Sequence, residues 1–281
     1  MDMYQLVMKR RSVRHFKDQV IPEAIIEKLL EGANNAPSGG NIQPLSVIVV
    51  REAEGRKRLA DIVGGQPWVK NAPVSMIFCL DFNRVKRWAA LYETEFKGEL
   101  ACSHFLIAYA DLMCAAQTVV LLAESYGLGS VYVGTIQSNI DEARQVFEIP
   151  QYVLPMMVLS LGYPKTVPAG IPKLKPDVIV HREKYRMRSD AEIRLALEEK
   201  YGEFGGKAEE YLEKAFIEMI EADKQGDGAW VDRATAEMVR LEIRNNAQFL
   251  FKLRYPADVM VKLNKKMIES FRNAGFDFFG E

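Results

Sequence analysis

The chain has 281 residues, of which 48% are hydrophobic and 27% are charged, and its formal net charge is −1 at pH 7. This balance is typical of a globular protein with one large domain or two small ones, and the near-zero charge argues against a nucleic-acid binder. Three cysteines are too few and odd in number for a disulfide framework, so we expect reduced thiols and a cytoplasmic protein. We expect no secretion signal and no membrane span, because the start lacks an apolar core segment and the apolar runs are short.

Helical and strand patterns alternate through the first two thirds of the chain. Apolar spacing predicts helices over residues 3–10 and 55–63, and another that begins at Pro22 and ends at Asn34. Asn139 and the residues after it have the pattern of a capping box, which predicts the start of a short helix. Short apolar runs predict buried strands over residues 46–50, 74–80, 130–133 and 154–161. Residues 104–126 are apolar on nearly every side, which predicts a long, central and buried helix.

The pattern changes from Ser189 onward, where strand signals disappear. Helical spacing predicts four helices, over residues 190–202, 207–224, 229–252 and 257–273. The chain therefore divides into an α+β part, residues 1–188, and an all-helical part, residues 189–281.

The first candidate site is the basic run Arg10, Arg11, Ser12 and Arg14. Arginine guanidinium groups are fork-shaped donors that suit a phosphate or another anionic group. The alternative interpretation of the run alone is a solvated basic surface.

The second candidate site is a loop between a helix and a strand. It contains Pro37, Ser38, Gly39, Asn41 and Gln43. Glycine lets the backbone approach a ligand closely, and the Ser, Asn and Gln side chains offer directional hydrogen bonds. Without further context, the same residues are typical of an ordinary turn.

Two later segments are weaker candidates. Residues 127–134 are rich in glycine, but a helix precedes them and a strand follows, which is the reverse of a dinucleotide-binding turn. Lys173 and Lys175 lie in a connector bounded by prolines, where an extended backbone points both ammonium groups to one side. Two exposed loop lysines are an equal alternative. Cys102 and His104 lack a second ligand pair, so we expect no metal site.

These motifs, taken in order over about residues 1–188, resemble the FMN-dependent nitroreductase family. The resemblance implies an α+β fold with a central, mainly antiparallel sheet flanked by helices, with an all-helical C-terminal extension added here. It also implies a homodimer formed through the long helix, with FMN at the interface.

The resemblance further implies a role for each candidate residue. The Arg10–Ser12 run would contact the phosphate and ribityl chain, and Arg14 the pyrimidine end of the flavin ring. The loop over residues 37–43 would reach the flavin held mainly by the other subunit. The segment Tyr132, Val133, Gly134 and Thr135 would lie over one face of the ring, with a backbone N–H near flavin N5. Lys173 and Lys175 would contact the phosphate.

The expected activity is hydride transfer from NADH or NADPH, through flavin N5, to a small-molecule acceptor such as a nitroaromatic or a quinone. Segment 81–103 is either an aromatic and basic lid over the substrate or a surface helix. A lid favours a specialised flavin enzyme, such as a reductive dehalogenase or a flavin-fragmenting enzyme. A third possibility is an FMN-binding module whose helical tail binds a protein partner.

Overall fold

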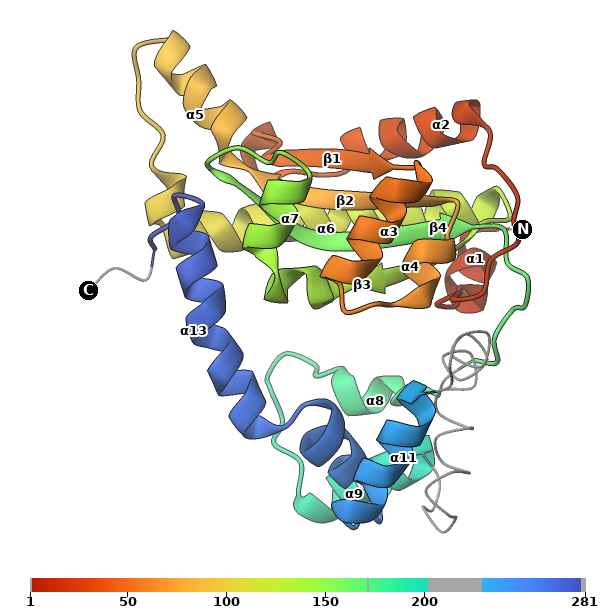
Figure 1. The fold of residues 1–281 in the computed structure, drawn as a ribbon. Coiled ribbons are helices and arrows are strands. Elements are labelled where there is room, and N and C mark those ends of the chain that lie inside the picture. The colour runs from red at the N-terminus through yellow and green to blue at the C-terminus, as the bar shows by residue number, and fades with distance from the viewer. Residues whose placement is uncertain (1, 171, 202–228, 279–281) are drawn as a thin grey trace. The chain divides into compact units, whose positions relative to one another are not determined.

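A computed structural model describes residues 2–170, 172–201 and 229–278 (Figure 1). The chain forms two compact units: Met1–Pro168 with Lys262–Glu281, and Ala169–Val261. The helix expected over residues 207–224 lies outside the described residues. The expected division into a domain of residues 1–188 and a helical extension of residues 189–281 stays a prediction.

The first unit alternates helices and strands, as the sequence predicts. Its helices are α1 (Met3–Lys9), α2 (Glu23–Asn34), α3 (Ala53–Ile62), α4 (Pro67–Asn71), α5 (Phe82–Leu91), α6 (Cys102–Ser125), α7 (Ile140–Val146) and the later part of α13 (Ala257–Asn273). Its strands are β1 (Leu45–Val50), β2 (Val74–Asp81), β3 (Gly129–Val133) and β4 (Val153–Gly162), and short 3₁₀ turns cover Gly39–Asn41, Gly98–Leu100 and Gly134–Ser138.

The four strands form one sheet in the order β1-β2-β4-β3, and every neighbouring pair is antiparallel. The expected central antiparallel sheet is thus confirmed. The inner strands β2 and β4 are buried along their whole length, which explains their apolar runs without alternation. Their register shifts between Phe78 and Cys79, where Pro155 stands opposite Cys79 and has no amide hydrogen to donate.

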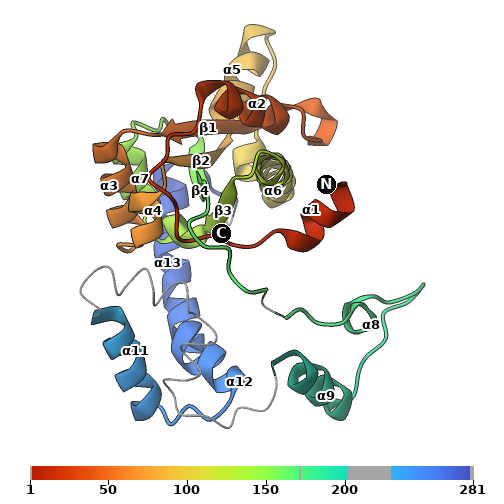
Figure 2. The same cartoon turned by 90° about the vertical axis from the view of Figure 1, so that its right-hand side faces the viewer.

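Helices cover both faces of the sheet (Figure 2). On one face α2 packs against α6, and on the other lie α3, α4 and α7. The approach of α2 to α6 is close at Gly32, where a Cβ atom would lie 2.1 Å from Leu122 Cδ1. A larger residue there would displace the Leu122 side chain.

The long helix α6 is buried on one side only. Residues such as Leu112, Ala116 and Val119 face the core, whereas Leu106 and Ile107 are 60% and 50% exposed. The expectation of a fully buried helix is therefore wrong for the single chain. By length and composition α6 would also pass as a membrane span, but core helices pass the same test, and α6 packs on the sheet and on α2.

The chain returns to the first unit at its C-terminal end. Phe271, Ala274 and Phe276 belong to the main hydrophobic core and are 3%, 0% and 1% exposed. The Phe276 ring stacks on Phe82 with centroids 5.5 Å apart. The backbone also ties this end to the first unit, because Tyr152 N–H donates to the Ala274 carbonyl at 2.8 Å. Residues 169–261 are thus enclosed in sequence by two parts of one unit.

The described part of the second unit is helical. It contains α8 (Pro176–Ile179), α9 (Asp190–Tyr201), α11 (Ala229–Arg240), α12 (Asn246–Gln248), a π-helical turn (Phe249–Arg254) and the start of α13. Predicted helices over 190–202 and 257–273 are confirmed. A single helix over 229–252 is wrong: the chain turns at Glu242, whose φ is +49°, and Asn245 caps α12 by accepting from the Gln248 amide at 2.9 Å.

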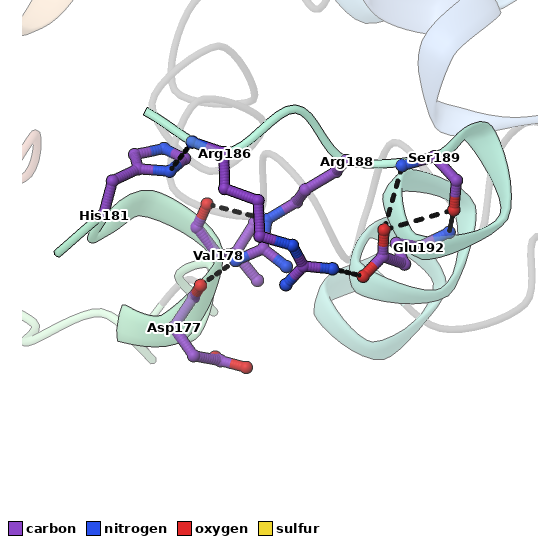
Figure 3. A network of polar contacts seen from close by, with 7 residues as sticks. All are labelled: Asp177, Val178, His181, Arg186, Arg188, Ser189 and Glu192. Atoms are coloured by element: carbon purple, nitrogen blue, oxygen red, sulfur yellow. Dashed lines mark hydrogen bonds and ion pairs between the residues drawn. The ribbon is translucent and has the colours of Figure 1, made fainter. Parts of the chain in front are cut away.

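A polar network joins α8 to α9 (Figure 3). Arg188 Nε donates to the Val178 carbonyl at 3.2 Å and its Nη2 to that of Asp177, so one guanidinium caps the end of α8. At the start of α9, Ser189 N–H donates to Glu192 Oε2 at 2.9 Å, and Glu192 N–H donates to Ser189 Oγ at 3.3 Å. This reciprocal capping box explains where α9 begins.

The capping box expected at Asn139 is absent from the structure. Its side chain makes no cap hydrogen bond to α7. Instead Asn139 Nδ2 donates to the Ile62 carbonyl at 2.6 Å, and its Oδ1 accepts from Lys266 Nζ at 2.9 Å. The residue ties α3 and α13 to the start of α7.

Phe276→Ala should destabilise the first unit strongly, because it removes a core ring that is 1% exposed. We expect a loss of about 3–5 kcal/mol in the free energy of unfolding, measured in urea. Phe251→Ala is the control, since Phe251 is 61% exposed, and it should change stability by less than about 0.5 kcal/mol. Equal small effects for both variants would contradict the role of the C-terminal segment in the core.

Candidate functional site

The segment of residues 10–16, between α1 and α2, runs along the edge strand β3, and we call it the strap. Ser12 forms a parallel bridge with Ser130, and Val13 N–H donates to the Ser130 carbonyl at 2.9 Å. Val13 is 2% exposed, and a Cβ atom at Gly129 would lie 2.5 Å from its Cγ2 atom, so glycine is needed for this contact. Because alternate residues of an extended strap face opposite sides, Ser12 and Arg14 remain half-buried beside the buried Val13.

Arg10 and Arg11 lie next to the end of α6. Arg11 Nη1 donates to the Met8 and Arg10 carbonyls at 2.8 Å each. Burial raises the pKa of the nearby Glu124 carboxyl, and the charges of Arg10 and Arg11 oppose this shift. Burial also raises the pKa of Tyr132 to about 12, and its hydroxyl donates to Gln117 Oε1 on α6 at 3.2 Å.

Arg14 lies over the ring of Trp68, with the guanidinium carbon 5.7 Å from the ring centroid. Trp68 Nε1 is buried and has no hydrogen-bond partner among the residues that the structure describes. Two residues before it, Gln66 Nε2 donates to Thr135 Oγ1 at 2.7 Å. Gln66 and Trp68 thus join two predicted site segments, although the sequence analysis did not select them.

The backbone is open where β3 ends. Val133 is buried, whereas Gly134 and Thr135 are exposed. Among the residues that the structure describes, only Met157 Cε, at 3.8 Å, would lie within 4 Å of a Cβ atom at Gly134. Because Gly134 has no side chain, a flat ligand can approach the main chain closely here.

The loop of residues 37–43 is held from α6. Gly39 N–H donates to both carboxylate oxygens of Asp111 at 3.0 Å, and Ser38 Oγ donates to Asp111 Oδ2 at 3.1 Å. Gln43 N–H donates to Ser38 Oγ at 2.9 Å. Asp111 is not among the residues predicted from the sequence, although an acidic residue in the middle of an apolar helix is a usable signal.

A pocket of about 280 Å³ lies beside this loop. Its walls are formed by Ala33, Asn34, Ala36, Pro37, Ser38, Ile42, Gln43, Leu45, Arg84, Asp111 and Ala115. Arg84 comes from α5, so the segment considered as a lid contributes one wall. Its lining combines apolar side chains with polar and charged groups that can orient a small molecule.

Lys173 and Lys175 lie in the second unit. Lys175 Nζ pairs with Glu199 at 2.9 Å, and this hydrogen bond and charge raise the pKa of Lys175. The arginines, the loop over residues 37–43 and the end of β3 belong to the first unit. A role for the two lysines at a phosphate stays a prediction.

The donors of the first unit fit a phosphorylated, planar ligand such as FMN. The strap supplies three guanidinium groups, a buried indole N–H beside Arg14 is unpartnered in the described structure, and the main chain at Gly134 is exposed. Guanidinium groups suit phosphate oxygens, and a fixed cation suits a ring that gains negative charge. Among the described residues, no group of three or more His, Cys, Asp or Glu residues has a metal-binding arrangement.

Comparison with known proteins places this fold among oxidoreductases. Residues 7–163 match the model of the Nitroreductase family. An FMN reductase [NAD(P)H] of Bacillus subtilis is 33% identical over 201 residues, 70% of this chain and 80% of the relative. The oxygen-insensitive NADPH nitroreductase of Salmonella typhimurium is 31% identical over 182 residues, 65% of this chain and 74% of the relative.

Solved structures agree with the sequence matches. The hypothetical oxidoreductase YcnD from Bacillus subtilis superposes with a TM-score of 0.75 at 26% identity, covering 98% of each chain. NfrA2 from B. megaterium gives 0.71 at 25% identity, covering 95% of this chain and 98% of the other. The chain belongs to the Nitroreductase family, which confirms the resemblance found in its motifs.

Glu124→Gln should change how stability depends on pH. Burial raises the pKa of the Glu124 carboxyl, so the folded protein binds this proton more tightly than the unfolded chain. The contribution of Glu124 to the free energy of unfolding is complete below the pKa of the unfolded chain, about 4.3. It is lost as pH rises through the raised pKa of the folded protein. Unfolding in urea between pH 4 and 7 should show the variant gaining stability relative to wild type as pH rises. Parallel profiles would contradict this.

Proposed function

We propose that this protein is an FMN-dependent oxidoreductase that takes a hydride from NADH or NADPH and delivers it to a small acceptor such as a nitroaromatic or a quinone. The observation that carries the proposal is the row of arginines fixed along edge strand β3, next to the open main chain at Gly134. The relatives named FMN reductase and NADPH nitroreductase support the cofactor and the nicotinamide donor.

In this proposal the strap binds the phosphate end of the cofactor. Arg10 and Arg11 supply guanidinium donors and Ser12 a hydroxyl, while the bridge to Ser130 keeps this backbone in place. FMN, when bound, accepts two electrons and a proton as hydride and passes them on.

Arg14 has a different task in the same site. Its guanidinium is held over Trp68, and a fixed cation there stabilises the negative charge that develops on the ring. The exposed main chain at Gly134 and Thr135 provides the surface for one face of the ring. Tyr132 and Val133, just before it, fix this surface to α6 and to the core.

We propose a cytoplasmic homodimer, in which the loop with Pro37 and Asn41 contacts the flavin held by the other subunit. Exposed apolar side chains on two helices support the dimer: α1 exposes Tyr4 and Met8, and α6 exposes Leu106 and Ile107. Such side chains are typical of surfaces that an interface covers.

The function is tested on the purified protein. We expect a yellow protein whose released flavin chromatographs as FMN, at about one per chain, and whose mass by light scattering is that of a dimer. It should oxidise NADH or NADPH when a nitroaromatic or a quinone is supplied. A colourless protein that takes up no added FMN overturns the proposal, and a flavin-loaded monomer overturns the dimer.

Arg14→Ala and Lys173→Ala should separate two roles. Arg14→Ala should lower the flavin midpoint potential by tens of millivolts, because about 30 mV corresponds to about 1.4 kcal/mol in a two-electron couple. It should weaken FMN binding less. Lys173→Ala should loosen FMN with little change in potential, if Lys173 faces the phosphate. Potentials from dye equilibration and Kd values from fluorescence titration measure both effects. Identical profiles for the two variants would contradict these assignments.

A further inference from the structure

The loop of residues 37–43 has an unfavourable backbone conformation. Gly40, Asn41 and Gln43 have φ values of +58°, +55° and +53°, in the left-handed region. Glycine adopts this region freely, but Asn41 and Gln43 adopt it at a cost of about 1 kcal/mol or more each. Such a conformation persists only where neighbouring groups hold it.

Asp111 holds the first half of the loop. Its carboxylate accepts the Gly39 amide and the Ser38 hydroxyl, and that hydroxyl in turn accepts the Gln43 amide. A Cβ atom at Gly39 would lie 2.7 Å from Ile107 Cγ2, so the loop backbone lies directly on α6. The only hydroxyl proton of Ser38 and the only amide proton of Gly39 are both used within the chain.

Arg84 holds the second half of the loop. Its Nη2 donates to the carbonyls of Gln43 and Leu45 at 2.5 and 2.8 Å. Its Nη1 lies 3.6 Å from Asp81 Oδ2, and that carboxylate is buried beside Ser46. The ion pair fixes the fork of the guanidinium, so the two carbonyls are held together.

We propose that Asp111 and Arg84 are positioning residues that set the flavin-contacting shape of this loop; the inference rests on the proposed function. Asp111 is a half-buried carboxylate within an apolar helix, a placement that is costly without its hydrogen bonds. Since Ser38 and Gly39 donate to Asp111, the loop presents the exposed Asn41 amide to the ring.

The test compares the flavin affinities of five variants with that of wild type. Kd values for FMN and for riboflavin are measured by fluorescence titration after removal of the cofactor from purified dimer. Asp111→Ala should weaken both flavins by the same factor, about 10-fold or 1.4 kcal/mol, because the loop acts on the ring and not on the phosphate. Arg84→Ala should weaken both several-fold. Glu142→Ala, an exposed acidic residue on α7, and Arg58→Ala, a surface arginine on α3, are the controls and should bind both flavins as wild type does.

Asp111→Asn keeps one carbonyl acceptor and should restore part of the affinity that Asp111→Ala loses. Hydrogen exchange in the flavin-free protein gives an independent reading, since the Gly39 and Gln43 amides should exchange faster in Asp111→Ala. If that variant does not fold, Arg84→Ala decides. If the folded Asp111→Ala variant binds both flavins as tightly as wild type, the inference is overturned but the proposed function is not. Where Asp111→Ala does not fold, the same result for Arg84→Ala overturns it. A wild-type protein that binds neither flavin overturns the proposed function as well.

Discussion

The pairing of the N-terminal strap with edge strand β3 is the contact on which the candidate site depends. A hydrogen bond from Val13 N–H to the Ser130 carbonyl and the packing of Val13 on Gly129 hold the strap beside β3. A hydrogen bond from Lys17 N–H to the Tyr163 carbonyl holds the chain just after it. A shift by one residue would turn Arg14 inward and Val13 outward, because alternate residues of an extended chain face opposite sides. The placement of the three guanidinium groups thus depends on this backbone pairing and on Val13, which packs against Gly129.

The strand next to β3 in the sheet, β4, is central and buried, and it supports the pairing of β3 with the strap. β4 lies between β2 and β3, is buried over its whole length, and carries the residues that pair with both neighbours. Ser75 and Ser160 hydrogen-bond across β2 and β4 at 2.8 Å, so the polar groups in this buried centre satisfy each other. Cys79 is buried on β2, and burial raises the pKa of its thiol to about 12, which keeps it inert. The edge strand that carries the strap therefore rests on a buried centre in which Cys79 is unreactive.

Local patterns in the sequence predicted the strands and helices of the first unit because each carries a strong apolar period. The strands around Met76 and Val158 have uninterrupted apolar runs, and the structure buries them on both faces. The site motifs were found for the same reason: glycines, prolines and clustered arginines stand out from a periodic background. Contacts between segments that are distant in the sequence could not be predicted from these local patterns. Asp111 pairs with a loop 72 residues away, and Gln66 with Thr135 across 69 residues. Asn139 looked like a helix cap, but its side chain instead bonds Ile62 and Lys266.

The return of the C-terminal segment to the core affects the order in which the protein can fold during synthesis. Phe276 stacks on Phe82 and Phe271 packs on Phe105, and these two partners are made 194 and 166 residues earlier. Until residue 276 has left the ribosome, the pocket that these rings fill is open to water, and all of residues 169–261 must be translated in that time. The first unit is thus exposed to chaperones and to aggregation for longer than a domain of contiguous sequence.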